Sequence, residues 1–311
     1  MMQLPASLKE RLTAWGKLLR IPNLFSVPGD PLAGFLIAGG LITEQTFALL
    51  SVCLSGFFAY LYGLISNDIA DLEIDREERP NRPLPSGAVA LAPAKTAMVL
   101  CAILSLVTAA FSTRTLIVGV LLLVFITLYN FVLKKYKHIG PAAMGACRFF
   151  HVLLGTAAVT ELVQVKFIYA LLFAFGVFLY IYGVTCAAAE ETKKLAKRPG
   201  GLLFFGGAVL AYIVLFLRMG MEPLTEWWDW LPGIFSALTA AVYIVIAWKG
   251  FRTFQRPSLP GIAQGWIGTL IGNLIFLQAA AAAAAGGWYI AIVLVIFWGL
   301  ARMTAVHFYG S

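Results

Sequence analysis

Four oxygen-bearing side chains recur at helical spacing near the end of an early apolar run: Asn67, Asp68, Asp71 and Asp75. If that run continues as a helix, Asn67, Asp71 and Asp75 fall at i, i+4 and i+8 on one face. Asp68 lies one residue further round the helix. Such a face suits a hard cation, because Mg²⁺ prefers oxygen ligands and is usually held by one or two carboxylates together with substrate phosphates. The pattern therefore predicts these four residues as ligands of Mg²⁺. A hydrated loop of mixed charge that caps a membrane helix is the alternative.

Basic residues follow this acidic face directly. Arg76, Arg79 and Arg82 are spaced so that they could meet the oxygens of a phosphate group, which arginine binds through a fork of parallel N–H donors. The whole stretch indicates a metal-bound diphosphate, with Asn67 and the three arginines among its binding residues.

The residue pattern of this stretch also resembles a known signature. N-D-x-x-D-x-x-x-D from Asn67, followed by R-P-N-R-P-L-P-S-G from Arg79 to Gly87, is similar to the first motif of the UbiA superfamily of intramembrane prenyltransferases. The resemblance implies an all-helical, Mg²⁺-dependent membrane enzyme that moves an isoprenyl group from a prenyl diphosphate to an aromatic or lipid-like acceptor, with Asp68 and Asp71 as catalytic residues. The compact motif is closer to members that act on chlorophyll precursors or archaeal-type glycerolipids than to the hydroxybenzoate branch.

The composition is that of a multispanning membrane protein. Apolar residues make up 60% of the chain and charged residues 12%, against about a quarter charged in an average soluble domain. One span needs about 20 mostly apolar residues, and ten stretches qualify: 22–41, 46–66, 93–111, 115–133, 140–159, 166–188, 201–219, 230–248, 262–284 and 287–306.

The resemblance implies nine spans and two similar halves. We therefore expect an all-α membrane protein with a bundle of nine to ten transmembrane helices around a central cavity. It would form a single domain over 22–311, with halves of about 22–159 and 160–311. Residues 1–21 place leucines on one helical face and basic residues elsewhere, which predicts an amphipathic helix in the membrane interface.

The net charge of +8 does not indicate a nucleic acid partner, because the basic residues fall between the spans and form no single patch. Nineteen of them lie on the amino-terminal side of the membrane in the ten-span arrangement, and only Arg114, Lys166 and Arg218 lie opposite. Basic loops stay in the cytoplasm. The amino terminus and both motif loops are therefore expected on the cytoplasmic side. The sequence does not indicate an oligomeric state.

Polar residues at the ends of the first and fourth spans are further candidates. Asn23 lies near the expected cytoplasmic end of the first span, where it would either line the substrate site or cap the helix. Lys134 and Lys135 close the fourth span in a basic loop, as family members commonly do. The former is a candidate for binding the diphosphate and the latter for catalysis, although both could act only as topology signals.

A charged residue also lies inside the fifth span. Arg148 falls about 12 Å into the membrane if that helix begins near Gly140, and a charge at this depth is costly, so it should face a polar cavity and take part in catalysis. We expect its partner to be a diphosphate, an acidic acceptor or one of the motif carboxylates, with a purely structural ion pair as the alternative. His151 shares its helical face and is either a hydrogen-bonding residue or an acid-base group.

The second half departs from the family pattern. Where a second aspartate-rich motif is expected after the sixth span, Tyr182, Cys186 and Glu190 share a helical face and no aspartate occurs. Glu190 is the candidate catalytic ligand of a second Mg²⁺, Tyr182 a substrate-binding candidate, and Lys193 and Lys194 would steady the leaving group. The alternatives are a solvated helix end, a weak or inactive lipid-binding protein of the same fold, or a multispanning transporter.

The predicted orientation is testable with cysteine labelling. Pro80→Cys and Lys194→Cys should each react with an impermeant thiol reagent only from the cytoplasmic face, because the count of basic residues puts both loops there. The parent protein, with its four native cysteines, is the control. Labelling of either added cysteine from outside would overturn the shared location of the two motifs.

Overall fold

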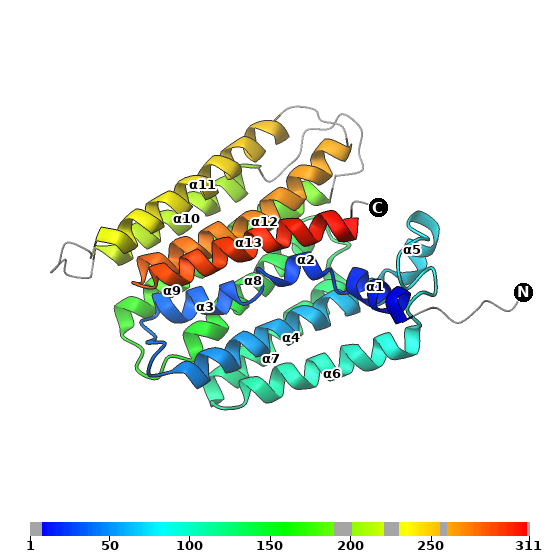
Figure 1. The fold of residues 1–311 in the computed structure, drawn as a ribbon, viewed down its shortest axis with the longest axis horizontal. Coiled ribbons are helices and arrows are strands. Elements are labelled where there is room, and N and C mark those ends of the chain that lie inside the picture. The colour runs from blue at the N-terminus through cyan, green and yellow to red at the C-terminus, as the bar shows by residue number, and fades with distance from the viewer. Residues whose placement is uncertain (1–7, 190–200, 221–229, 256–259, 310–311) are drawn as a thin grey trace, which may run out of the picture.

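The computed structural model describes residues 8–189, 201–220, 230–255 and 260–309, and every regular element within them is helical. The all-helical prediction is therefore confirmed for these residues (Figure 1). The short helices are α1 (Leu8–Leu18), α2 (Ile21–Leu24), α3 (Gly29–Ile37) and α5 (Leu72–Glu78). The long ones are α4 (Thr46–Ala70), α6 (Leu91–Ala109), α7 (Thr113–Leu128) with its π-helical continuation η1 (Tyr129–Leu133), α8 (Ile139–Ala157), α9 (Gln164–Ala188), α10 (Gly201–Met219), α11 (Trp230–Phe254), α12 (Pro260–Ala284) and α13 (Trp288–Tyr309).

Seven helical stretches of the described chain are long and apolar enough to cross a membrane. They are 46–70, 91–109, 113–133, 164–188, 201–219, 230–254 and 265–284. Only 11% of the apolar window of α6 is buried, so its leucines and valines face outward, as they would toward lipid. The same window of α12 is 78% buried, which makes α12 a central helix. The protein is an integral membrane protein.

Three expected spans are not among these seven. The first, 22–41, is divided into α2 and α3, with Pro22 near the start of α2 and Pro28 immediately before α3. The fifth corresponds to α8, which carries the buried side chains of Arg148 and His151, and the last to α13, whose apolar part is shorter. The count of nine to ten spans stays a prediction.

Close backbone contacts hold α3 against α8. A Cβ added at Gly155 would overlap the carbonyl oxygen of Pro31, and one added at Gly34 would overlap the carbonyl oxygen of Val152. Small residues allow this approach between membrane helices, where packing replaces the hydrophobic effect. The alanines from Ala279 to Ala284 at the carboxyl end of α12 are likewise almost completely buried in the bundle.

One end of the bundle gathers the elements that matter for the site. Figure 1 shows α1, α5 and the carboxyl end of α13 at the same end, where α4 also finishes. Helix α1 exposes Leu8 and Leu12 and buries Leu18. Its position in the membrane interface stays a prediction. The acidic motif therefore lies at the end of a long helix, beside the amino-terminal helix.

Gly155→Ala tests the contact between α3 and α8. The added methyl group meets the backbone of Pro31, so the two helices must move apart. We expect a loss of about 1 to 3 kcal/mol of stability, the usual cost of overpacking, measured as a lower thermal unfolding midpoint in detergent. Gly206→Ala on α10 is the matched control, because a Cβ there meets nothing within 4 Å. Equal midpoints for both variants would contradict the close packing.

Candidate active site

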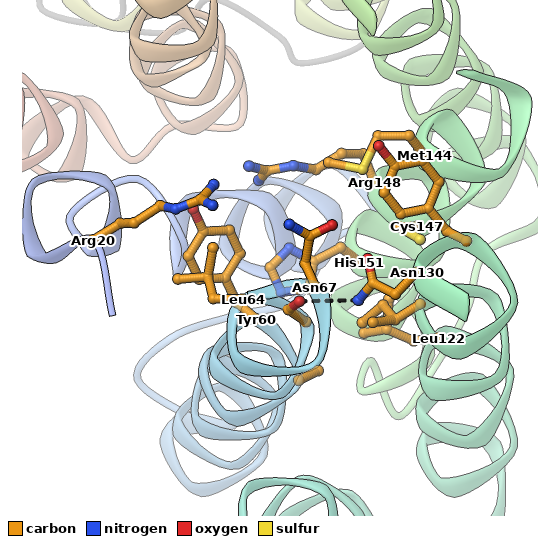
Figure 2. Close-up of a pocket in the computed structure, with 14 residues that line it drawn as sticks. Arg20, Tyr60, Leu64, Asn67, Leu122, Asn130, Met144, Cys147, Arg148 and His151 are labelled. Carbon is orange, nitrogen blue, oxygen red and sulfur yellow. Dashed lines mark hydrogen bonds between the residues drawn. The ribbon is translucent and has the colours of Figure 1, made fainter. Parts of the chain in front are cut away.

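A cavity of about 210 Å³ lies between α4, α7, η1 and α8 (Figure 2). Its apolar wall is formed by Ala59, Gly63, Leu64, Leu122, Ile126, Met144 and Cys147. Its polar lining is formed by Arg20, Tyr60, Asn67, Tyr129, Asn130, Arg148 and His151. A mostly apolar cleft with a few polar groups is the usual form of a site for a small molecule.

The acidic motif lies where α4 ends. Helix α4 stops at Ala70 and α5 begins at Leu72, so the motif spans two helices instead of one. The backbone N–H of Asp71 still donates to the carbonyl of Asn67 at 3.0 Å, and that of Asp75 donates to the carbonyl of Asp71 at 2.8 Å. The expected i, i+4, i+8 repeat therefore continues through the junction.

Each aspartate of the motif pairs with a different cation. Asp68 binds Arg20 at 3.0 Å and Asp71 binds Lys134 at 2.5 Å. Asp75 binds Arg82 at 2.6 Å. Within the part of the chain that the structure describes, no three His, Cys, Asp or Glu side chains are grouped as a metal site. The three aspartates among the predicted ligands are thus neighbours in sequence, but their carboxylates do not converge on one point.

Two of the predicted metal ligands do converge. The Nζ atom of Lys134 lies 2.5 Å from Oδ1 of Asp71 and 3.3 Å from Oδ1 of Asn67, so one cation is shared by a carboxylate and an amide oxygen. Both are hard oxygen donors of the kind that Mg²⁺ prefers. The chemistry of this donor pair therefore fits Mg²⁺.

The π-helical turn η1 brings Lys134 to this position. Asn130, on η1, donates to the carbonyl of Gly63 at 2.9 Å (Figure 2). It also donates to Oγ of Ser66 at 2.7 Å, and the two bonds join η1 to α4. Single π-helical turns within α-helices are frequent at functional sites. Lys135, by contrast, is exposed and lies over the ring of Tyr136, so the structure does not bring this predicted catalytic residue to the cavity.

A second, outer cavity of about 450 Å³ adjoins the motif. Arg79 and Arg82 line it together with Arg20 and Lys17, and Asp68 and Glu78 line it as well. Binding of phosphate by the two arginines stays a prediction. Arg76 lines neither cavity and instead forms an exposed ion pair with Glu73 at 2.8 Å.

Arg20 is the residue that sequence reasoning missed at this end. It lines both cavities, and its backbone has φ 47° and ψ 54°, a left-handed conformation that costs energy outside glycine. The available signal was its place as the last basic residue before Pro22, where the first span opens.

Arg148 pairs with none of the motif carboxylates; it forms the ion pair that was the alternative expectation, and its contact with a diphosphate or an acceptor stays a prediction. Its Nη1 donates to Oδ2 of Asp30 at 2.7 Å, and Nδ1 of His151 lies 3.2 Å from the same oxygen. The Nε2 of Gln278 donates to Oδ1 of Asp30 at 2.7 Å. The close packing of α3 against α8 brings Asp30 opposite Arg148, and none of the motif carboxylates reaches so deep. An acidic residue inside the first apolar run was the sequence signal for this pair.

The remaining candidates are less informative. Asn23 lines neither cavity, and its carbonyl accepts a hydrogen bond from Oγ of Ser26 at 2.9 Å. Tyr182 stacks with Phe178 on α9, with ring centroids 6.2 Å apart. The candidates of the second motif, Glu190, Lys193 and Lys194, lie outside the described residues.

Comparison with known proteins identifies the family. The model of the UbiA prenyltransferase family matches residues 31–260. This chain belongs to the UbiA prenyltransferase family. It is 35% identical to digeranylgeranylglyceryl phosphate synthase of Methanocaldococcus jannaschii over 137 residues, which cover 44% of this chain and 48% of the relative. It is 28% identical to 4-hydroxybenzoate octaprenyltransferase of Escherichia fergusonii over 179 residues, which cover 55% of this chain and 60% of the relative.

Solved structures agree in fold. A structure of digeranylgeranylglyceryl phosphate synthase in membranes superposes with a TM-score of 0.61 at 24% identity, covering 89% of this chain and 99% of the other. A UbiA homolog from Archaeoglobus fulgidus bound to GPP and Mg²⁺ superposes with a TM-score of 0.54 at 14% identity, covering 88% of this chain and 99% of the other. The UbiA-type fold therefore extends over nearly the whole chain.

The Asp30–Arg148 pair predicts a specific pattern of stability. Arg148→Met leaves a buried carboxylate without its cation and should cost about 3 to 5 kcal/mol, measured by unfolding in detergent. Combining it with Asp30→Asn removes the uncompensated charge and should recover most of the loss. Arg76→Met, which breaks an exposed pair, should change stability little. A double variant no more stable than Arg148→Met would argue against a direct charge coupling.

Proposed function

We propose that this protein is a Mg²⁺-dependent prenyltransferase that moves a prenyl group from a prenyl diphosphate to a hydrophobic acceptor within the membrane. The observation that carries the proposal is the convergence of Asn67 and Asp71 on one cation at the end of an apolar cavity. Family membership supports it. The first two relatives match this chain over only 48% and 46% of their own length, so the activity, like the substrates, is our proposal.

The proposed roles follow from charge. The departing diphosphate carries several negative charges, which Mg²⁺, when bound, would help to neutralise. Asn67 and Asp71 would hold that ion, with Asp68 and Asp75 as further oxygen ligands. Each aspartate already has a basic partner, so Arg20, Lys134 and Arg82 would turn from carboxylate to phosphate oxygens when substrate arrives. Arginine and lysine both bind phosphate well.

The apolar wall of the cavity would protect the reaction. A prenyl carbon that loses diphosphate becomes an electrophile that water would capture, and exclusion of water is a recognised role of closed sites. Leu64, Leu122 and Ile126 supply apolar surface beside Asn67. The same surface would hold the start of the prenyl chain.

We also propose the finer architecture expected from the sequence. The chain would cross the membrane nine to ten times in two similar halves, 22–159 and 160–311, with residues 1–21 in the interface and both motif loops in the cytoplasm. The uneven distribution of basic residues supports this orientation.

Two other functions were open from the sequence. Membership of the UbiA family argues against a transporter. A lipid-binding protein without turnover remains the second candidate, because the place of the second motif carries Glu190 and no aspartate. Incubation of the purified protein with labelled prenyl diphosphates, Mg²⁺ and a membrane lipid extract separates the two: we expect a prenylated product, and binding without product would favour the lipid-binding protein.

The metal site predicts the effect of single substitutions. Asp71→Ala should abolish Mg²⁺-dependent binding of geranyl diphosphate, measured by calorimetry in detergent, because it removes a converging ligand. Asp68→Ala should weaken it, because Asp68 is proposed as a further oxygen ligand of the ion. Glu73→Ala is the matched control, since Glu73 is exposed beside the motif and pairs only with Arg76 among its described contacts. Unchanged affinity in Asp71→Ala would refute the site.

A further inference from the structure

Among the described contacts of the acidic motif, Lys134 is the basic side chain that bonds to two predicted metal ligands. Its ammonium group donates to Oδ1 of Asp71 at 2.5 Å and to Oδ1 of Asn67 at 3.3 Å. Arg20 and Arg82 each bind only one aspartate of the motif. A metal ion that used the amide and carboxylate oxygens would compete with the ammonium group for both of them, because two cations so close together repel each other.

The backbone of Lys134 is fixed, whereas its side chain can move. Its N–H donates to the carbonyl of Tyr129 at 3.0 Å, and Asn130 bonds η1 to α4. A Cβ added at Gly140 would lie only 3.0 Å from Cα and from the carbonyl oxygen of Lys134, so α8 packs closely against this backbone. The lysine side chain itself is 25% exposed and carries its charge on a flexible stem. The ammonium group can therefore leave the motif by rotation of the side chain alone.

The three ion pairs of the motif are balanced in charge, with one basic partner for each aspartate. Mg²⁺ that arrived alone would add two positive charges beside three cations. A prenyl diphosphate that arrived alone would add several negative charges beside three carboxylates. The two together largely cancel, and the diphosphate offers the displaced ammonium group a new partner.

We propose that Lys134 determines the form in which the metal is accepted: it keeps free Mg²⁺ from Asn67 and Asp71, and it releases them when a diphosphate group binds its ammonium group. The site then takes the metal and the diphosphate as one unit. Binding of either one strengthens binding of the other by the same factor. This inference rests on the proposed function, which supplies the diphosphate.

The first test measures binding of metal without donor. Mn²⁺ takes the same oxygen ligands as Mg²⁺, and its free concentration is followed by electron paramagnetic resonance with the full-length protein in detergent. Lys134→Met should bind Mn²⁺ at least about fivefold more tightly than the wild type, because the competing cation is gone. Lys137→Met is the matched control, since it removes the same charge from an exposed position of the same loop. Equal affinities in the wild type and Lys134→Met, or an equal gain in Lys137→Met, overturn the proposal.

The second test measures the donor in the same variants. Geranyl diphosphate is titrated by calorimetry at saturating Mg²⁺, and Lys134→Met should bind it at least about fivefold more weakly, because the diphosphate has lost the ammonium group. Damage to the fold would weaken binding of the metal and of the donor alike. Only the proposed coupling changes the two affinities in opposite directions, so a change of both in the same direction overturns it.

The wild type decides even if Lys134→Met does not fold. Its thermal unfolding midpoint in detergent should rise when Mg²⁺ and geranyl diphosphate are added together, because a ligand of the native state stabilises that state. Mg²⁺ alone should raise it much less. A rise with Mg²⁺ alone as large as with both ligands overturns the proposal.

Donor binding in these samples separates this inference from the proposed function. Wild-type protein that does not bind geranyl diphosphate in the presence of Mg²⁺ refutes both. Wild-type protein that binds the donor with Mg²⁺, but whose affinity for Mn²⁺ alone is the same with and without Lys134, refutes only the role of this lysine.

Discussion

The carboxylate of Asp30 must find positive and polar partners inside a membrane protein, and this requirement ties three helices together. Arg148 and His151 come from α8 and Gln278 from α12. For these bonds to form, α3 must lie against α8 with almost no side chain between them, which explains the backbone contacts at Gly34 and Gly155. Arg148 and His151 of this cluster also line the cavity.

The two charged ends of the cavity differ in how firmly their charges are held. The Asp30–Arg148 pair is almost completely buried, so separation of its partners is costly. At the motif, Arg20 and Lys134 keep 32% and 25% of their side-chain surface exposed, and their ion pairs are cheaper to break. The motif end therefore suits an exchange of partners when a charged substrate arrives, whereas the Asp30–Arg148 pair suits a permanent contact between helices.

Local features of this fold were predictable from the sequence, and contacts between distant segments were not. The apolar runs predicted α4, α9, α10 and α11, and most of the predicted helix ends lie within a few residues of the observed ones. They could do so because a span has a fixed minimum length. The i, i+4 spacing of Asn67 and Asp71 survives because it depends on neighbouring backbone only. Asp30 and Arg148 lie 118 residues apart, and no pattern in the sequence near either residue indicates that their helices are in contact. The contribution of Arg20 depends on a left-handed backbone that no periodicity reveals.

The alanines at the carboxyl end of α12 leave that end of the helix with little to fix its position along the helix axis. Side chains of one small size present a nearly smooth cylinder, so a slide by one turn would exchange alanine for alanine. Hydrogen bonds from two polar residues oppose such a slide. Asn273 donates to the carbonyl of Tyr243 at 2.9 Å. Gln278 donates to the carbonyl of Ser26 at 3.0 Å and to the carboxylate of Asp30 at 2.7 Å. The depth of α12 in the bundle, and with it the support under Asp30, is thus set by these amide groups together with the large buried side chains of Leu270, Leu274 and Phe276.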